Sequence, residues 1–261
     1  MPTAELNGID LYYESHGEGP AVVFLHGAAG NHLSWWQQVP AFRERFRCIT
    51  IDHRGFARST DPTNAGGAEF VRDLEALLDE LQLDRVSLVA QSMGGRTALG
   101  FAILHPQRVE ALVMADTWGF FDWPELQDEV RRLREEAGGQ DAPLTERALG
   151  AAFQARETAR TFLYRQIAAL NPPRDAAAAA ASPADAPDRE AVSRLTVPTL
   201  FLVGGDDQLT PPAIIRRVQE IVPGSEYREF PGLGHSVYFE DAAAFNETLG
   251  TFLGAHVTVP A

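Results

Sequence analysis

Ala90-Gln91-Ser92-Met93-Gly94-Gly95 is the stretch of sequence that decides the fold. The apolar run that ends at Ala90 is typical of a buried strand, and the small-residue run from Gly94 to Leu104 is typical of a helix. Ser92 therefore lies on a sharp strand-to-helix turn, which tolerates only small residues two positions before and after it. A small-x-Ser-x-small pentapeptide is common by chance, but at such a junction the turn exposes the serine Oγ beside the first helical N–H groups. This position predicts that Ser92 is a nucleophile displayed beside an anion site.

Polar residues that could activate a serine follow two later strands. The apolar run Thr199–Val203 ends before Gly204-Gly-Asp-Asp207, and the alternating run Ser225–Phe230 leads to Gly234-His235. Each polar residue thus follows the carboxyl end of a strand, the edge at which open α/β sheets gather ligands. A serine hydroxyl needs a base to take its proton and a further group to orient that base. We therefore predict Ser92 as nucleophile, His235 as general base and then acid, and Asp207 as the group that orients the imidazole.

Several motifs in one order carry a family resemblance. They are His26-Gly27, Asp52-His-Arg-Gly-Phe-Ala-Arg-Ser59, Ser92-Met-Gly-Gly95, Gly204-x-x-Asp207 and Gly234-His235. In these motifs the chain resembles, over nearly its whole length, the α/β-hydrolase superfamily in its capped esterase, lactonase and carbon–carbon hydrolase branch. It departs at Ala90, where the fullest form of the turn has glycine, and at Gln91, where histidine is frequent. Haloalkane dehalogenases and epoxide hydrolases are disfavoured, because they need an aspartate where Ser92 stands.

The acidic member of the predicted triad has two competitors. Asp206 is adjacent, but the family pattern counted from Gly204 matches Asp207. Asp116 follows the next strand over, and some relatives draw their acid from that position. We expect Asp116 instead to cap the strand end at the turn that leads to Trp118, and the choice between Asp116 and Asp207 stays open here.

The resemblance also implies an oxyanion hole and a substrate pocket. The backbone N–H groups of Met93 and Ala28 are the expected oxyanion donors, and His26 is expected to fix the loop that carries Ala28. All four tryptophans cluster after the oxyanion loop or after the strand that precedes the insertion. We expect an apolar chamber there, lined by Trp35, Trp36, Trp118, Phe120, Phe121 and Trp123.

Strand and helix patterns alternate along most of the chain, which predicts an α/β fold with a mostly parallel sheet of about eight strands flanked by helices. This alternation ends after Thr117, and only helical patterns follow, including 125–137, 144–155 and 158–170. We therefore predict a core domain of residues 1–117 and 194–261, with a helical cap, 118–193, inserted between the sixth and seventh strands. Within the segment 172–190 an alanine run favours helix, but prolines interrupt it, which leaves a mobile linker as the alternative.

Composition excludes several function classes. All 22 basic residues are arginine, so Schiff-base chemistry on a lysine is excluded, and the net charge of −14 argues against nucleic acid or an anionic membrane as partner. The chain contains no glycine-rich nucleotide loop and no metal-ligand spacing, so we expect no cofactor and no metal. The single cysteine, Cys48, lies in an apolar run, and neither a signal peptide nor a membrane span is indicated. We expect a cytoplasmic protein that acts on a small molecule; the oligomeric state cannot be inferred from the sequence.

The working hypothesis is a serine hydrolase that cleaves a small to medium, mainly apolar carboxylic ester or lactone through an acyl-enzyme. One alternative is carbon–carbon bond hydrolysis of a vinylogous diketone, which uses the same serine and histidine. A further alternative is a ligand receptor or signalling protein that retains the triad. Fold alone does not decide among them.

Overall fold

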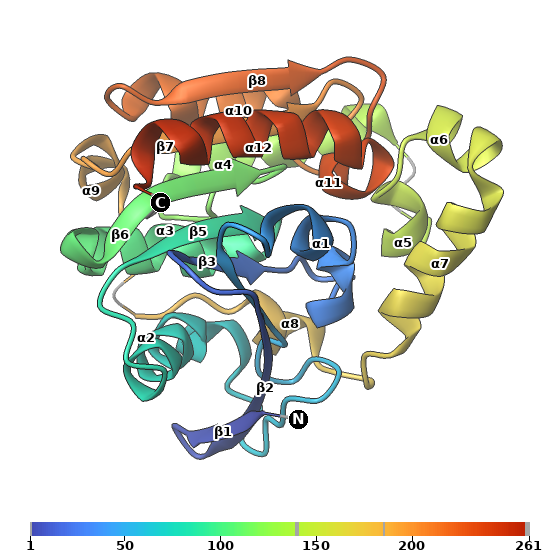
Figure 1. The fold of residues 1–261 in the computed structure, drawn as a ribbon. Helices are drawn as coiled ribbons and strands as arrows, with labels where there is room; N and C mark the ends of the chain where they lie inside the picture. Colours follow the sequence, from blue (N-terminus) through green and yellow to red (C-terminus); the bar gives the residue numbers. More distant parts are fainter. Residues whose placement is uncertain (1, 139–140, 185, 259–261) are drawn as a thin grey trace.

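The sheet is built around strands that the sequence marks as apolar runs. A computed structural model describes residues 2–138, 141–184 and 186–258. The described strands form one eight-stranded sheet in the order β1-β2-β4-β3-β5-β6-β7-β8 (Figure 1). The prediction of a mostly parallel sheet of about eight strands is confirmed. The strands are β1 (Thr3–Leu6), β2 (Ile9–His16), β3 (Ala21–Leu25), β4 (Arg47–Ile51), β5 (Val86–Gln91), β6 (Val109–Ala115), β7 (Thr199–Gly204) and β8 (Glu226–Phe230).

The sheet is antiparallel only at its amino-terminal edge. Asn7 and Gly8 have φ of 48° and 74°, the left-handed values that a tight hairpin turn requires, and they connect β1 to β2. Strand β2 also runs antiparallel to β4, whereas β4, β3, β5, β6, β7 and β8 are mutually parallel. The carboxyl ends of these parallel strands therefore meet at one edge, where loops carry the polar residues predicted above.

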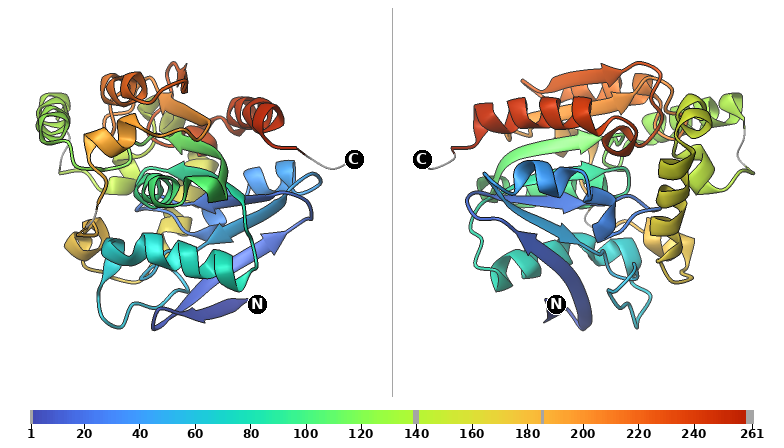
Figure 2. Two further views of the ribbon diagram at one scale, coloured as in Figure 1. Left: turned by 90° about the vertical axis from the view of Figure 1, so that its left-hand side faces the viewer. Right: turned by 45° about the vertical axis from the view of Figure 1, so that its right-hand side comes forward.

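Helices cover both faces of the sheet (Figure 2). Alternate strand residues enter two apolar clusters: Val23 and Leu25 pack with α2, α3, α4 and α10, whereas Val22 and Phe24 pack with α1, α11 and α12. No helix among the described residues is both long and apolar enough to cross a membrane. The helices on the two faces are α1 (Gln38–Phe42), α2 (Phe70–Glu80), α3 (Gly94–Leu104), α4 (Pro124–Ala137), α10 (Pro212–Ile221), α11 (Val237–Glu240) and α12 (Ala242–His256), with 3-10 turns η1 (His32–Trp35), η2 (Gly66–Glu69) and η3 (Pro106–Arg108).

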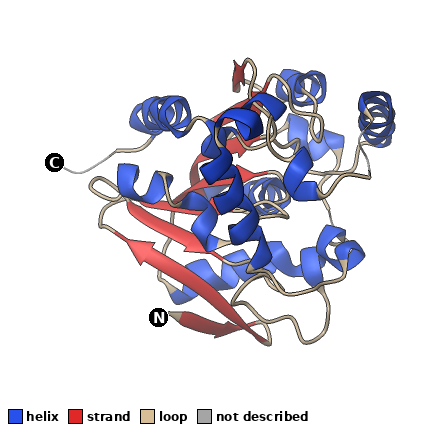
Figure 3. Ribbon diagram, turned by 90° about the vertical axis from the view of Figure 1, so that its right-hand side faces the viewer, coloured by secondary structure: helices blue, strands red, loops and turns tan. Residues whose placement is uncertain are grey.

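A helical insertion separates β6 from β7, as predicted. Figure 3 views the molecule from the side at which the parallel strands end, and helices of the insertion lie in front of the sheet there. Its first helix, α4, contributes Leu126 and Val130 to the core cluster on one face of the sheet. The helices that follow α4 are α5 (Leu144–Arg147), α6 (Ala151–Arg156), α7 (Thr158–Ala169), α8 (Ala176–Ala180) and α9 (Arg189–Ser193).

Two expectations within the insertion are corrected. The single helix expected over 144–155 is divided into α5 and α6, because the N–H of Gly150 donates to Glu240 Oε1 at 3.1 Å instead of continuing a helix. The alanine run forms α8, whose first turn is capped by the Asp175 carboxylate through the Ala177 N–H. Helix α8 packs against η2, so this part of the segment 172–190 is a docked helix rather than a mobile linker. Residue 185 lies outside the described residues.

Candidate active site

The turn at Ser92 has the strained backbone that the sequence predicts. Ser92 follows β5 directly, has φ of 49°, and donates its N–H to Ala115 O of the neighbouring strand at 3.0 Å. A Cβ on Gly94 would collide with the backbone of Leu25, and one on Gly95 would collide with the side chain of Thr117. Only glycine allows the first turn of α3 to approach β3 and the end of β6 this closely. The strain at Ser92 is thus held by tight packing on both sides.

The three side chains predicted as a triad lie in one hydrogen-bonded row. Ser92 Oγ donates to His235 Nε2 at 2.8 Å, and His235 Nδ1 donates to Asp207 Oδ2 at 2.8 Å. The second carboxylate oxygen of Asp207 accepts the N–H groups of Leu209 and Thr210 at 2.8 and 2.9 Å. His235 and Asp207 are buried, whereas Ser92 is partly exposed. The arrangement provides a serine hydroxyl with an oriented imidazole.

Asp116 takes neither role that the sequence left open for it. Its Oδ1 accepts the N–H of Gly204 at 2.9 Å, and its Oδ2 accepts the N–H of Val237 at 3.2 Å. It therefore joins the loop that leads to Asp207 with the loop that follows His235. The expected cap of the turn to Trp118 is corrected: Thr117 Oγ1 accepts the N–H of Gly119 there. Burial, reinforced by the nearby Asp207 carboxylate, raises the pKa of Asp116 well above its ordinary value.

Glu240 is a second buried carboxylate beside the histidine loop, and the sequence analysis missed it. Its Oε1 accepts the N–H of Gly234, next to His235, and that of Gly150 in the insertion, both at 3.1 Å. A Cβ on Gly234 would collide with the backbone of Gly150, so glycine is needed where these segments meet. Burial raises the pKa of Glu240. No local pattern marks the contact between Glu240 and Gly150, because these two residues are 90 positions apart.

The two predicted oxyanion donors face the same cavity as Ser92. Ala28 and Met93 line that cavity, and within the described residues neither backbone N–H is paired with an acceptor. His26 anchors the loop before Ala28: its Nδ1 donates to Gly27 O at 2.8 Å, and its Nε2 accepts the His53 N–H at 3.0 Å. Complete burial lowers the pKa of His26 to about 4, which keeps the imidazole neutral and able to accept.

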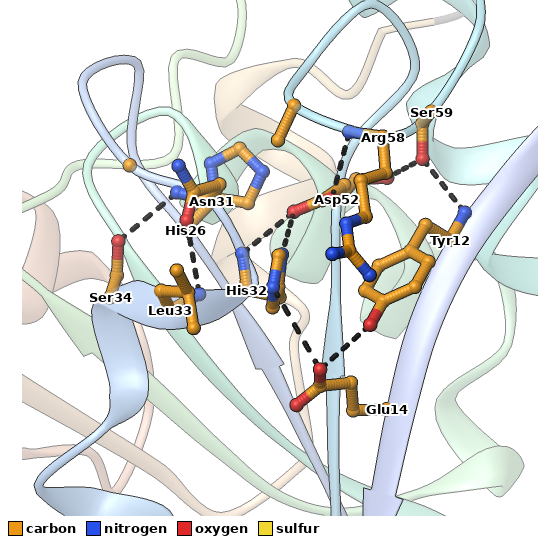
Figure 4. Close-up of polar contacts among 12 residues, drawn as sticks. Tyr12, Glu14, His26, Asn31, His32, Leu33, Ser34, Asp52, Arg58 and Ser59 are labelled. Atoms are coloured by element: carbon orange, nitrogen blue, oxygen red, sulfur yellow. Dashed lines mark hydrogen bonds and ion pairs between the residues drawn. The ribbon is translucent and has the colours of Figure 1, made fainter. Parts of the chain in front are cut away.

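A second set of contacts joins His32, at the end of the loop that carries Ala28, to residues that follow β4 (Figure 4). Asp52 Oδ1 accepts both the backbone N–H and the ring Nδ1–H of His32, at 2.7 and 2.8 Å, while its Oδ2 accepts the N–H of Arg58. Ser59 Oγ donates to Asp52 O at 2.6 Å and accepts the N–H of Tyr12. The motif that begins at Asp52 thus supports the loop that carries Ala28, and its Phe56 packs against Met93, the residue after Ser92.

The cavity beside Ser92 has a volume of about 410 Å³, and its lining differs from the predicted aromatic chamber. Phe120 is the one predicted aromatic residue that lines it. Trp35 is fully buried between Phe24 and Tyr238. Trp36 is 41% exposed, and its ring contacts that of Phe239. Trp118, Phe121 and Trp123 are buried in the core cluster that includes α4. The lining consists of Ala28, Ser92, Met93, Arg96, Phe120, Leu144, Pro172, Pro173, Arg174, Ala176, Ala179 and Ala180.

Four of the predicted residues, Trp35, Trp118, Phe121 and Trp123, pack in the core because burying a large ring against other apolar groups is more favourable than exposing it at a cavity wall. Trp36 lies at the surface instead. The insertion instead contributes small residues and prolines, which sequence reasoning did not assign to the pocket. Within the described ranges, no group of three or more histidine, cysteine, aspartate or glutamate residues is arranged to hold a metal ion.

Known proteins of similar sequence and structure include hydrolases of several kinds and bromoperoxidases. The structure of a thermophilic esterase from Thermogutta terrifontis, with malate bound, is 28% identical with a TM-score of 0.83, covering 98% of this chain and 97% of that chain. The enol-lactonase from Burkholderia xenovorans is 27% identical with a TM-score of 0.79, covering 97% of this chain and 100% of that chain. A 2-hydroxy-6-oxononadienedioate/2-hydroxy-6-oxononatrienedioate hydrolase from Cupriavidus pinatubonensis is 27% identical in an alignment 259 positions long that covers 89% of this chain and 86% of that protein.

The family model for the alpha/beta hydrolase fold matches residues 20–242. This range contains the turn at Ser92, the loop of Asp207, the loop of His235 and the whole insertion. The chain therefore belongs to the α/β-hydrolase fold family, and the protein is a hydrolase of that family.

Proposed function

We propose that this hydrolase cleaves a small to medium, mainly apolar carboxylic ester or lactone through an acyl-enzyme formed on Ser92. One observation carries the proposal. The row from Ser92 Oγ through His235 to Asp207 has two contacts of 2.8 Å and opens into the cavity of about 410 Å³. This volume lies toward the lower end of the roughly 300–1,000 Å³ that ligand pockets occupy.

In this proposal each group has one task. His235 Nε2 takes the proton of Ser92 Oγ as the oxygen attacks the carbonyl carbon, and Asp207 Oδ2 holds the Nδ1–H and stabilises the imidazolium. The carbonyl oxygen becomes an oxyanion beside the N–H groups of Ala28 and Met93, each contributing roughly 3 kcal/mol to transition-state stabilisation. The imidazolium then protonates the departing alcohol oxygen. A water molecule, deprotonated by His235, attacks the acyl carbon and releases the acid.

Relatives support an ester or a lactone as substrate class. The two solved structures compared above are those of an esterase and an enol-lactonase, and both are at least 27% identical over almost the whole chain. A lactone is an internal ester, so both need the same nucleophile and the same oxyanion donors.

Carbon–carbon hydrolysis is the second candidate, because the relative from Cupriavidus pinatubonensis is named for a substrate of that kind. Cleavage of a vinylogous diketone also begins at a carbonyl beside a serine and histidine, so the site geometry fits both reactions. The two reactions can be distinguished by giving esters, lactones and diketones to one preparation of the enzyme and identifying which bond is cleaved.

The test is a panel of p-nitrophenyl esters, lactones and diketones, assayed with wild type and Ser92→Ala. We expect ester or lactone turnover in the wild type only, and labelling of Ser92 by a fluorophosphonate. Full ester turnover by Ser92→Ala would refute the proposal. Turnover confined to diketones would favour the second candidate. No turnover and no labelling would also refute it, in favour of a ligand receptor.

A further inference from the structure

Two guanidinium groups lie on the wall of the cavity beside Ser92, and the proposed chemistry uses neither. Arg96 is in the first turn of α3, four residues after the nucleophile, and Arg174 lies between α7 and α8. The side chains that line this cavity include no carboxylate. Among the described residues, neither arginine takes part in an ion pair, although 36 aspartate and glutamate residues occur in the chain.

Arg96 is held by neutral groups only. Its Nη1 donates to the carbonyl oxygens of Ala179 and Ala181 at 3.4 and 3.2 Å, and its guanidinium lies 5.3 Å from the centre of the Phe120 ring. Its Nε is buried without a hydrogen-bond acceptor in the described part of the chain. Burial lowers the pKa of Arg96 to about 10, the direction expected for a cation that lacks a compensating anion.

Arg174 approaches the oxyanion loop from the insertion. Its Nη2 donates to the carbonyl oxygen of Ala28, and its guanidinium lies 4.0 Å from the centre of the Phe56 ring. Burial lowers the pKa of Arg174 as well. The remaining donors of Arg174 have no acceptor within the described residues, so they are available to a ligand in the cavity.

A desolvated cation is costly unless an anion or several acceptors compensate it. Here two such cations line one cavity that is otherwise formed by alanine, proline, leucine, methionine and phenylalanine side chains with Ser92. A negatively charged ligand would supply the anion that compensates these two guanidinium groups. A carboxylate fits better than a phosphate, because the donors of Arg174 and Arg96 that are not already bonded to carbonyl oxygens can meet its two oxygens, whereas the cavity offers few further donors for a dianion with three oxygens.

We infer that the substrate carries a free carboxylate, bound by Arg174 and Arg96, so that the enzyme acts on half-esters of dicarboxylic acids or on lactones that bear a carboxylate. This inference rests on the proposed function and narrows its substrate class. The ester group lies at Ser92, a short apolar chain crosses the alanine- and proline-lined part of the cavity, and the carboxylate ends at the guanidinium groups.

The test compares two substrates that differ only in charge: monomethyl glutarate and its primary amide, methyl 4-carbamoylbutanoate. The quantity measured is the ratio of their kcat/KM values. We expect the wild type to favour the carboxylate by about tenfold to a hundredfold, the effect of a charge-assisted hydrogen bond. Arg174→Gln and Arg96→Gln should each lower this ratio by about tenfold or more. Because the amide experiences the same change in cavity shape, the ratio separates charge recognition from any disturbance of the oxyanion loop.

Arg156→Gln is the matched control. Arg156 is an exposed arginine on α6 that does not line the cavity, so its replacement removes the same charge from the insertion and should leave the ratio at the wild-type value. A second measurement needs no turnover: isothermal titration of monomethyl glutarate into Ser92→Ala should give a Kd that rises about tenfold or more when Arg174→Gln is added.

The outcomes distinguish the two proposals. Equal turnover of half-ester and amide by the wild type would overturn the inference and leave the proposed ester hydrolysis intact. An unchanged ratio in Arg174→Gln and Arg96→Gln, equal to that of Arg156→Gln, would overturn it in the same way. Turnover of neither glutarate ester nor any member of the ester panel, with no labelling of Ser92, would overturn both.

Discussion

Acidification should loosen the fold through His26, and the structure sets the size of the effect. The buried ring accepts the His53 N–H at Nε2, so protonation of that nitrogen removes the acceptor and places a charge in the core. Burial lowers the pKa of His26 from 6.5 to about 4. As the pH falls below about 6.5, the unfolded chain binds a proton at this position and the folded chain does not, so the free energy of unfolding decreases.

The magnitude follows from that difference in pKa. Each pKa unit is worth about 1.4 kcal/mol, so this histidine alone should remove about 2 kcal/mol of stability between about pH 7.5 and pH 5, and about 3 kcal/mol by about pH 4. The buried ring of His53, whose pKa burial also lowers, adds to the acid sensitivity of the wild type, whereas Asp116 and Glu240, whose pKa values burial raises, act in the opposite direction. Only the difference between wild type and a variant isolates His26.

The informative variant is His26→Gln, whose amide oxygen can accept the His53 N–H and does not titrate in this range. Urea unfolding, followed by the fluorescence of the four tryptophans, gives the free energy of unfolding at each pH. We expect the variant to be less stable at about pH 7.5 but to lose about 2 kcal/mol less than the wild type by about pH 5. Parallel pH curves for the two proteins would show that the reasoning about His26 is wrong.

Three substitutions test the rest of the site. Asp207→Asn should lower kcat by roughly 10³- to 10⁴-fold, since the imidazole loses its orienting acceptor; the exposed neighbour Asp206→Asn is its control, and equal effects of the two would contradict the assignment. Asp116→Asn should reduce the free energy of unfolding by about 1–3 kcal/mol in urea titrations, because an amide N–H then faces one of two backbone donors; an unchanged unfolding midpoint would count against it. Ala180→Leu, on the cavity wall, should lower kcat/KM for a butanoyl ester by roughly tenfold relative to the acetyl ester of the same alcohol, and equal losses would argue that this wall does not contact the substrate.

The row of Ser92, His235 and Asp207 could be predicted from the sequence because each member has a local signal. Ser92 stands in a strand-to-helix turn whose small neighbours are required by close packing, and Asp207 and His235 each follow a strand of the same parallel sheet. Parallel strands bring such positions to one edge whatever the sequence between them. The alternation of strands and helices and the site of the insertion could be predicted because hydrophobic periodicity reports burial directly.

The pocket wall could not be predicted in this way. The sequence shows that aromatic residues cluster near the oxyanion loop, but not whether a ring turns toward the cavity or toward the core, and Trp35 turned to the core. The wall is formed instead by Ala176, Ala179 and Ala180 of α8, whose docking depends on the close approach of Gly66 to the backbone of Ala178. That approach joins segments more than a hundred residues apart, and no pattern within either segment records it.

The buried carboxylates show why the insertion and the site are one unit rather than a lid placed on a finished core. Glu240 accepts N–H groups from Gly150 in the insertion and from Gly234 beside His235, so a single side chain sets the position of both. Asp116 does the same for the loops of Asp207 and His235. Both carboxyl groups are desolvated in the folded chain, and this cost persists only because each satisfies two backbone donors that would otherwise be buried unpaired. The geometry of the row from Ser92 through His235 to Asp207 therefore depends on polar contacts behind it as much as on the three side chains that form it.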